Sequence, residues 1–319
     1  MDKVDILLSI YNPNLDYLRE QLISINNQTY ANIDLYVYDD CIDKRTSQNF
    51  INKYITNYPI HFLPYEENNL GYTKAFEKLT IASKGKYVAF CDQDDVWHND
   101  KIEKCVNELK KSHALLVASD KSIIDKDDNI IIPSVRAVSN KNYDSWKTGD
   151  DIMKYNFVIT FAVGMSMVLD GDFARSIVPF SSYTGHDKWA LACAAIEGIV
   201  AFIDEPLVDY RRHGNNVSGI LVGINTKDDY YKARIKPNEN VLNDLIKKYG
   251  NFPDKKELLD FIDARKKGDT KRLKKYEYIA PDVVKFEIVM SRIPKKLFPV
   301  FLLTVRKIAS RKKKWRPQF

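Results

Sequence analysis

The amino-acid sequence predicts an α/β fold, in which a mixed, mainly parallel sheet is flanked by helices and followed by a C-terminal helical region. Short apolar segments of strand length alternate with segments whose apolar residues recur at helical spacing. Polar and acidic residues follow several of these strands. After Gly223 the pattern changes to polar helices, so we place a domain boundary near residue 222. The predicted domains are therefore residues 1–222 and 223–319.

Each predicted element follows from a local pattern of apolar residues bounded by turn residues. The expected strands are residues 4–10, 33–38, 60–63, 87–91, 114–118, 162–169 and 201–210. The expected helices are residues 15–25, 46–58, 73–83, 99–112, 171–176 and 188–197, then 228–249, 255–267 and 270–278. A hairpin is possible across residues 126–129. Neither the glycine-rich dinucleotide motif nor a phosphate-binding P-loop is present, which argues against ordinary dehydrogenases and P-loop enzymes.

Composition and charge restrict the function. The 319 residues are 45% hydrophobic and 29% charged, as in a soluble globular protein. We expect cytoplasmic synthesis, because no N-terminal signal pattern precedes the first strand. The four cysteines are scattered, which predicts reduced thiols rather than a zinc site or disulfides. Residues 281–319 carry a local charge of +9 within a total of +6, so the folded part offers no basic face for nucleic acid.

The segment 86–97 is the centre of the predicted site. An apolar run ends in Asp92, Asp94 and Asp95, at the carboxyl end of a strand, where ligands of open α/β sheets bind. Three neighbouring carboxylates repel one another unless a positive group neutralises them, and a divalent metal bound to a diphosphate would do so. The alternative is an acidic turn that caps the following helix.

Other polar groups end neighbouring strands or begin helices. Ser9 and Tyr11 lie at the end of the first strand and Asp40 at the end of the second, where they could contact a base or ribose or could cap turns. Lys74 lies near a helix N-terminus, which suits a diphosphate, although it could equally be a solvated lysine. Asp187 opens a helix and is either a first-turn acid or a general base aimed into the cleft.

A Gly/Asn-rich loop over residues 211–219 contains two arginines and His213. A loop histidine is usually an ordinary surface residue, but a neutral imidazole is also a good metal ligand. We therefore consider His213 as a third ligand beside Asp94.

In this order, the motifs resemble those of the inverting GT-A glycosyltransferases of family 2. The resemblance covers roughly residues 3–219. It is carried by residues 8–12 (Leu-Ser-Ile-Tyr-Asn), 38–40 (Tyr-Asp-Asp), 69–71 (Asn-Leu-Gly), 90–97 (Phe-Cys-Asp-Gln-Asp-Asp-Val-Trp) and 185–189 (Gly-His-Asp-Lys-Trp). Residues 92–97 together with 210–219 are most similar to the rhamnosyltransferase-like branch that builds bacterial surface polysaccharides. The family's frequent Asp-Gly-Ser after the second strand is replaced here by Asp40-Cys41-Ile42.

The resemblance implies a GT-A catalytic domain over residues 1–222 and a role for each candidate residue. Ser9, Tyr11 and Asp40 would hold the nucleotide, Lys74 the base or diphosphate, and Asp92 the ribose or a metal-bound phosphate. Asp94 and His213 would bind Mg²⁺ or Mn²⁺, and Asp187 would be the catalytic base.

The activity that this resemblance implies is inverting transfer of a sugar to a hydroxyl of a lipid-linked or growing surface glycan. The donor would be a nucleoside diphosphate sugar, with rhamnose from dTDP-rhamnose as the first choice and a UDP-hexose as the alternative. A catalytically silent scaffold that binds a nucleotide or glycan is a further alternative. The sequence leaves oligomeric state open.

The C-terminal tail combines apolar residues at helical spacing over 286–308 with a basic end. Its uncharged run, residues 297–305, is too short to span a bilayer, which requires about 20 residues. We expect a basic amphipathic segment that contacts the inner face of the cell membrane peripherally. The alternative is a helix packed on the protein with a solvated basic end.

Overall fold

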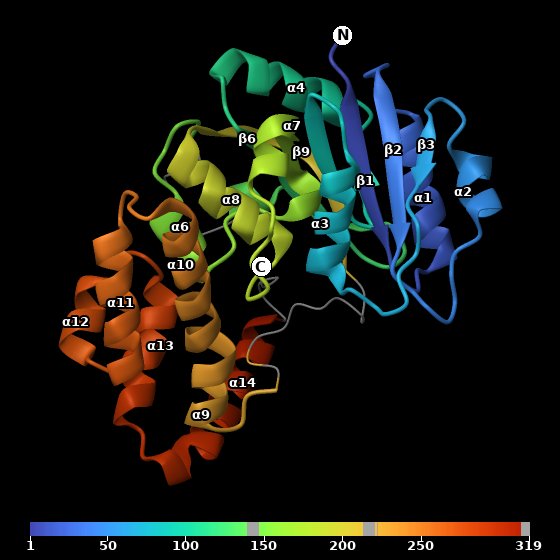
Figure 1. Ribbon diagram of the computed structural model, residues 1–319. Helices are drawn as coiled ribbons and strands as arrows, with labels where there is room; N and C mark the ends of the chain where they lie inside the picture. Colours follow the sequence, from blue (N-terminus) through green and yellow to red (C-terminus); the bar gives the residue numbers. More distant parts are fainter. Residues whose placement is uncertain (139–146, 213–220, 222, 314–319) are drawn as a thin grey trace. The chain divides into compact units, whose positions relative to one another are not determined.

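The computed structural model describes residues 1–138, 147–212, 221 and 223–313 and divides the chain into two compact units (Figure 1). The first unit comprises Met1–Ile152 and Thr160–Gly214, and the second comprises Met153–Ile159 and Asn215–Phe319. The short segment from Met153 to Ile159 belongs to the second unit although it lies far upstream in the sequence. Local patterns had given no sign of this exchange.

Within the described residues, nine strands of the first unit form one mixed sheet with the order β3-β2-β1-β4-β8-β6-β9-β5, and β7 pairs with β6. Neighbouring strands are parallel from β3 to β4 and between β6 and β9, whereas β8, β5 and β7 pair antiparallel. The strands are β1 Val4–Ile10, β2 Ile33–Asp39, β3 Ile60–Phe62, β4 Tyr87–Cys91, β5 Val96–Trp97, β6 Leu116–Ile124, β7 Ile130–Ile132, β8 Met167–Asp170 and β9 Val200–Arg211.

Helices cover both faces of this sheet (Figure 1). Alternate residues of β1 and β4 pack with α1, α2 and α4 in one core. On the other face, the Phe90 ring of β4 contacts Phe76 of α3 and His186 of α8. The helices of this unit are α1 Leu15–Asn26, α2 Gln48–Tyr54, α3 Tyr72–Ala82, α4 Lys101–Ser112, α5 Val135–Val138, α7 Gly171–Ser176 and α8 His186–Glu197.

The expected α/β architecture is confirmed, with local differences. Residues 164–166, expected to continue a strand, form a short 3-10 helix before β8. The strand expected at 114–118 is β6, which extends to Ile124 and forms the predicted hairpin with β7. All four cysteines are free and buried.

The second unit is helical throughout its described part. Its core contains a fully buried ion pair, in which the Arg265 guanidinium contacts the Glu287 carboxylate at 2.7 Å and Tyr230 donates to the same carboxylate at 2.8 Å. Its helices are α6 Met153–Val158, α9 Lys227–Tyr230, α10 Lys236–Tyr249, α11 Lys255–Lys267, α12 Thr270–Lys275, α13 Pro281–Arg292 and α14 Phe298–Lys313, with a π-helical turn at Tyr231–Ile235 and a 3-10 turn at Lys295–Leu297.

The apolar residues of the tail divide between two environments. Several of them pack inside the second unit, beside Tyr230 and Ile235: Phe286, Met290, Ile293, Phe298, Phe301, Leu302 and Val305. A second set stays exposed: Val289, Leu297, Val300 and Leu303. The turn at 293–297 also separates α13 from α14. The tail is therefore not one continuous amphipathic helix, and no described helix has both the length and the apolar content needed to cross a bilayer.

Candidate active site

The ends of three parallel strands bring the predicted polar residues together. Ser9 of β1 pairs with Tyr38 of β2, and Leu8 pairs with Cys91 of β4, so the residues after each strand lie side by side. The helices α3 and α8 begin close to each other, because the Thr73 hydroxyl donates to the Thr184 carbonyl at 3.2 Å. The α8 N-terminus carries Asp187.

Asp92, Asp94 and Asp187 lie close enough to interact electrostatically. The pKa of Asp92 is raised to about 7, first because its carboxyl group is removed from water and then because of the negative charges of Asp94 and Asp187. Asp92 and Asp187 are 95 positions apart in the sequence, so this proximity arises from the fold. That the two acidic segments face one cleft stays a prediction.

The described residues include no set of three His, Cys, Asp or Glu side chains that could hold a metal ion unaided. His213 lies outside the described residues. Mg²⁺ in phosphate-transferring enzymes is nevertheless commonly held by one or two carboxylates plus substrate phosphates. The mutually repelling carboxylates of Asp92 and Asp94 fit that donor set, in which a diphosphate supplies the remaining oxygens.

Asp95 does not cap the following helix, contrary to the alternative considered for it. Helix α4 begins at Lys101 after Asp100, and no side chain caps it. Asp95 is completely buried, and one of its carboxylate oxygens accepts the main-chain N–H of Arg211 at 3.0 Å. Burial raises the pKa of Asp95, and the negative charges of Asp94 and Asp92 raise it further. Asp95 is thus an internal link between β4 and β9.

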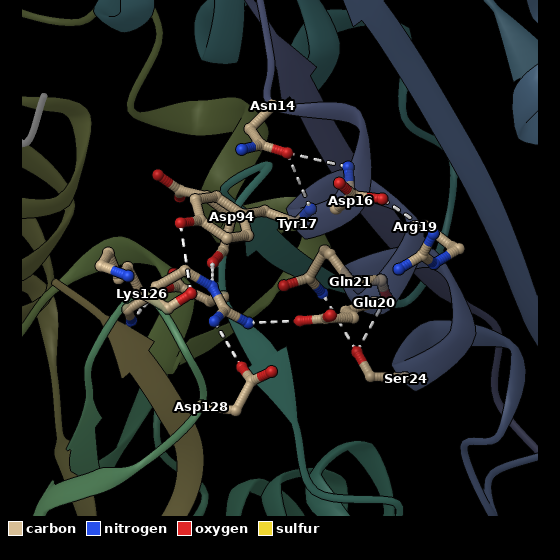
Figure 2. A network of polar contacts seen from close by, with 12 residues as sticks. Asn14, Asp16, Tyr17, Arg19, Glu20, Gln21, Ser24, Asp94, Lys126 and Asp128 are labelled. Atoms are coloured by element: carbon tan, nitrogen blue, oxygen red, sulfur yellow. Dashed lines mark hydrogen bonds and ion pairs between the residues drawn. The ribbon is translucent and has the colours of Figure 1, made fainter. Parts of the chain in front are cut away.

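The Gly/Asn-rich sequence around Arg211 predicted that this residue lies in a loop, and the structure shows otherwise. It is the last residue of β9, and its side chain is completely inaccessible to solvent. Its guanidinium contacts groups from α1, the Asp94 turn and the β6–β7 turn (Figure 2). The neighbouring Arg212 donates its main-chain N–H to the Ile124 carbonyl at 2.9 Å.

The Gln93 side chain joins the Asp92–Asp94 turn to the end of β1. Its amide oxygen accepts the Tyr11 main-chain N–H at 2.8 Å, and its amide nitrogen donates to the Tyr11 carbonyl at 3.2 Å. The Tyr11 ring is largely exposed, and Asn12 adopts a positive φ of 42°. The sequence did not single out Gln93, because nothing local marks a residue between two acids as a main-chain partner.

Asp40 has a structural role whatever it binds. Its two carboxylate oxygens accept the main-chain N–H groups of Leu70 and Gly71, each at 2.8 Å, and the side chain is buried. Asp40 therefore fixes the loop that leads into α3, where Gly71 has a positive φ of 76°. On that helix, the Lys74 ammonium group forms an ion pair with Glu77 at 2.7 Å. Ser9 is partly buried at the end of β1.

His186, next to Asp187, lies in an aromatic cage. Its ring stacks on Phe76 with a centroid distance of 3.9 Å and meets Phe90 edge-on at 4.7 Å. Neither ring nitrogen has a hydrogen-bond partner, and burial lowers the pKa of His186 to about 4. A Cβ atom at Gly164 would lie 2.5 Å from the His186 ring. A neutral imidazole thus anchors the first turn of α8 by packing alone.

Comparison with known proteins shows which family the chain belongs to. The family model described as glycosyl transferase family 2 matches residues 5–172. An uncharacterized glycosyltransferase, alr2836 of Nostoc sp., is 23% identical over 78% of this chain and 77% of its own length. The putative teichuronic acid biosynthesis glycosyltransferase TuaG of Bacillus subtilis is 24% identical over 67% of this chain and 81% of its own.

Solved structures share the fold. A crystal structure of S. aureus TarS 1–349 in complex with UDP-GlcNAc aligns with a TM-score of 0.58 and 14% identity, covering 88% of this chain and 82% of that one. A complex of the same TarS fragment with UDP aligns with a TM-score of 0.57. The likeness to TarS extends to the fold, and the family match covers more than half of the chain. The chain belongs to glycosyl transferase family 2 and is a glycosyltransferase.

Proposed function

We propose that this glycosyltransferase transfers a sugar, with inversion, from a nucleoside diphosphate sugar to a hydroxyl group of a lipid-linked or growing surface glycan. The observation that carries the proposal is that the end of β4, which leads to Asp92 and Asp94, lies beside the end of β1, and that α8, which carries Asp187, begins next to α3. The charges of Asp94 and Asp187 both raise the pKa of Asp92. Two acids from one strand end and one from a helix N-terminus supply the groups that a nucleotide sugar and an acceptor hydroxyl each require.

The donor is a UDP- or dTDP-linked sugar. Resemblance of residues 92–97 and 210–219 to rhamnosyltransferases favours dTDP-rhamnose, whereas the UDP-GlcNAc and UDP complexes of the TarS neighbours favour a UDP sugar. The teichuronic acid assignment of TuaG supports a bacterial surface polysaccharide as the product class. The exposed Tyr11 ring lies at the end of β1, where a nucleobase could stack on it.

Asp187 would act as the general base. The acceptor hydroxyl gives its proton to the Asp187 carboxylate as its oxygen attacks the anomeric carbon from the face opposite the diphosphate. The bond from the anomeric carbon to the diphosphate oxygen breaks, and its electron pair leaves with the nucleoside diphosphate. The aromatic cage of His186 fixes the first turn of α8 and so aims the base.

Asp94, assisted by Asp92, would hold Mg²⁺ or Mn²⁺, and the ion would supply Lewis-acid stabilisation of the departing diphosphate. Burial raises the pKa of Asp92 and the negative charges of Asp94 and Asp187 raise it further, so a nearby positive charge would favour its ionised form. His213 would be a further ligand. Lys74 stands near the N-terminus of α3, where a cation and free N–H groups suit a diphosphate.

A nucleotide-sugar panel tests the proposal. The thermal midpoint of the purified protein is measured with UDP-glucose, UDP-galactose, UDP-GlcNAc and dTDP-rhamnose, each with Mn²⁺ and with EDTA. We expect one nucleotide class to raise the midpoint, and more so with Mn²⁺. Turnover is then followed as release of UDP or dTDP in the presence of lipid-linked acceptors. Binding without any turnover across the acceptor panel would instead support the silent scaffold.

We further propose that the second unit touches the inner face of the cell membrane. The side chains of Leu297, Val300 and Leu303 are exposed and follow one another at intervals of three residues, and Lys295 and Lys296 directly precede Leu297 in the sequence. Apolar side chains flanked by lysines suit an anionic lipid surface, where each basic residue contributes about 1 kcal/mol.

Vesicle flotation tests the membrane proposal. Replacing Leu297, Val300 and Leu303 together by serine should reduce flotation with vesicles that contain phosphatidylglycerol. A matched triple variant at exposed apolar residues of the first unit, Ile23, Ile42 and Ile81, should float like the wild type. Equal flotation of both variants would contradict the proposed contact.

A further inference from the structure

The buried guanidinium of Arg211 is the strongest unassigned feature of the site, and we infer that Arg211 is a positioning residue for Asp94. It holds the Asp94–Asp95 turn in place by joining it to helix α1 and to the β6–β7 turn. The inference rests on the proposed role of Asp94 in binding the metal and the diphosphate. It adds a residue that contacts neither of them.

Two hydrogen bonds fix the acidic turn to Arg211. The Arg211 side-chain Nε–H donates to the Asp94 carbonyl at 3.0 Å, and the Arg211 main-chain N–H donates to the Asp95 carboxylate at 3.0 Å. One residue therefore holds the main chain of Asp94 and the side chain of the next residue. The direction in which the Asp94 carboxylate points depends on both.

The terminal nitrogens of the guanidinium have partners in two other elements, Glu20 of α1 and Asp128 of the β6–β7 turn, both labelled in Figure 2. One terminal nitrogen donates to Glu20 of α1 at 2.5 Å, and the other contacts Asp128 in the β6–β7 turn. The Tyr17 ring of α1 lies 4.4 Å from the guanidinium carbon, within the range of a cation–π contact. These partners are far away in the sequence: Glu20 and Arg211 are 191 positions apart.

Burial makes this arrangement rigid. An arginine without solvent contact is stable only when its charge is paired and its N–H groups are satisfied. The planar guanidinium offers donors in fixed directions, which a lysine ammonium group does not. Any movement of the Asp94 carbonyl away from Arg211 would leave a buried N–H without an acceptor. The network therefore resists displacement of the turn when ligands bind.

The experiment compares the Mn²⁺ dependence of UDP affinity in four proteins. The variants are Arg211→Lys, Glu20→Ala and, as a matched control, Asp16→Ala. Asp16 is also an acid of α1, but it pairs with Arg19 at the surface rather than with Arg211. The dissociation constant of UDP is measured by calorimetry with Mn²⁺ and with EDTA, well below the thermal midpoint of each protein.

We expect Mn²⁺ to tighten UDP binding at least about fivefold in the wild type and in Asp16→Ala. In Arg211→Lys and Glu20→Ala the ratio of the UDP dissociation constant in EDTA to that in Mn²⁺ should fall below about twofold. The affinity for UDP in EDTA should stay unchanged. A purely structural Arg211 would lower the thermal midpoint and leave the ratio intact.

The outcomes separate the two levels of inference. A wild-type ratio retained in both Arg211→Lys and Glu20→Ala would overturn the positioning role while leaving the function of Asp94 in place. Absence of any Mn²⁺ effect in the wild type would overturn the metal role of Asp94, and the inference with it. If Arg211→Lys does not fold, Glu20→Ala decides the question, because Glu20 is partly exposed and only one of several partners of the guanidinium.

Discussion

The two acidic regions of the site are held in place by opposite means. The turn that carries Asp94 is fixed by hydrogen bonds and a buried charge, through Arg211 and Gln93. The helix start that carries Asp187 is fixed by packing, because His186 lies uncharged between Phe76 and Phe90 without a hydrogen bond to its ring. Each region carries one of the two carboxylates that raise the pKa of Asp92.

This difference predicts which changes each region is sensitive to. A polar network fails when one partner is lost, because the remaining buried groups have no replacement. An aromatic cage fails when its ring becomes charged or changes volume. The Asp94 turn should therefore be sensitive to removal of single polar groups, and the Asp187 region to acid.

The largest effect is expected from removal of the buried charge. Arg211→Ala should destabilise the protein by about 3–5 kcal/mol, because it leaves Glu20 and the Asp94 carbonyl without their donor. Urea unfolding followed by circular dichroism measures this loss. Asp16→Ala, which removes an exposed ion pair, should cost less than about 1 kcal/mol. Equal losses of unfolding free energy in Arg211→Ala and Asp16→Ala would contradict the claim that the buried polar network holds the Asp94 turn.

Acid should destabilise the region around Asp187, because His186 is neutral in the folded protein. The folded-state pKa of His186 is about 4, below its ordinary value of 6.5, so the unfolded chain takes up the proton first. The contribution of neutral His186 to the free energy of unfolding is fully present above pH 6.5. It is lost as the pH falls toward 4, by up to about 3 kcal/mol. His186→Phe keeps the aromatic packing and should flatten this part of the stability profile.

Unfolding free energies from pH 7 to pH 4 measure the effect, with His113→Asn as the control at an exposed histidine in left-handed conformation. The control should keep the wild-type slope. A His186→Phe profile as steep as the wild type would show that the cage does not depend on a neutral ring.

Sequence patterns predicted the sheet and the residues at its strand ends, because both are recorded locally. An apolar run followed by acids marks β4 and Asp92 without knowledge of any distant residue. The same patterns placed Arg211 in a loop, since glycines and asparagines follow it. Its partners come from α1 and the β6–β7 turn, which no local pattern brings to the end of β9.

The role of Asp95 was missed for the same reason. An acid shortly before a helix is usually a cap, and only the pairing of β5 with β9 brings Arg211 to its carboxylate. His186 gave no signal either, because its cage combines rings from α3 and β4. Long-range packing, rather than local preference, determined each of these environments.

The smallest effect on stability is expected at Gln93. Gln93→Ala removes two exposed hydrogen bonds to Tyr11, so it should cost less than about 1 kcal/mol. The affinity for UDP should nevertheless fall about threefold or more, because the end of β1 is no longer tied to the acidic turn. Calorimetric titration with UDP measures this. Unchanged affinity in Gln93→Ala would show that the tie is dispensable.

The central claim is that Asp94 serves nucleotide binding whereas Asp187 serves as the general base. The Asp187→Asn variant tests this claim most directly. Turnover is measured with the nucleotide sugar that binds best in the panel, alongside the dissociation constant of UDP. Loss of the base should lower turnover by about 10²–10⁴-fold, with UDP affinity unchanged. Turnover close to that of the wild type, or loss of UDP binding together with turnover, would contradict the account.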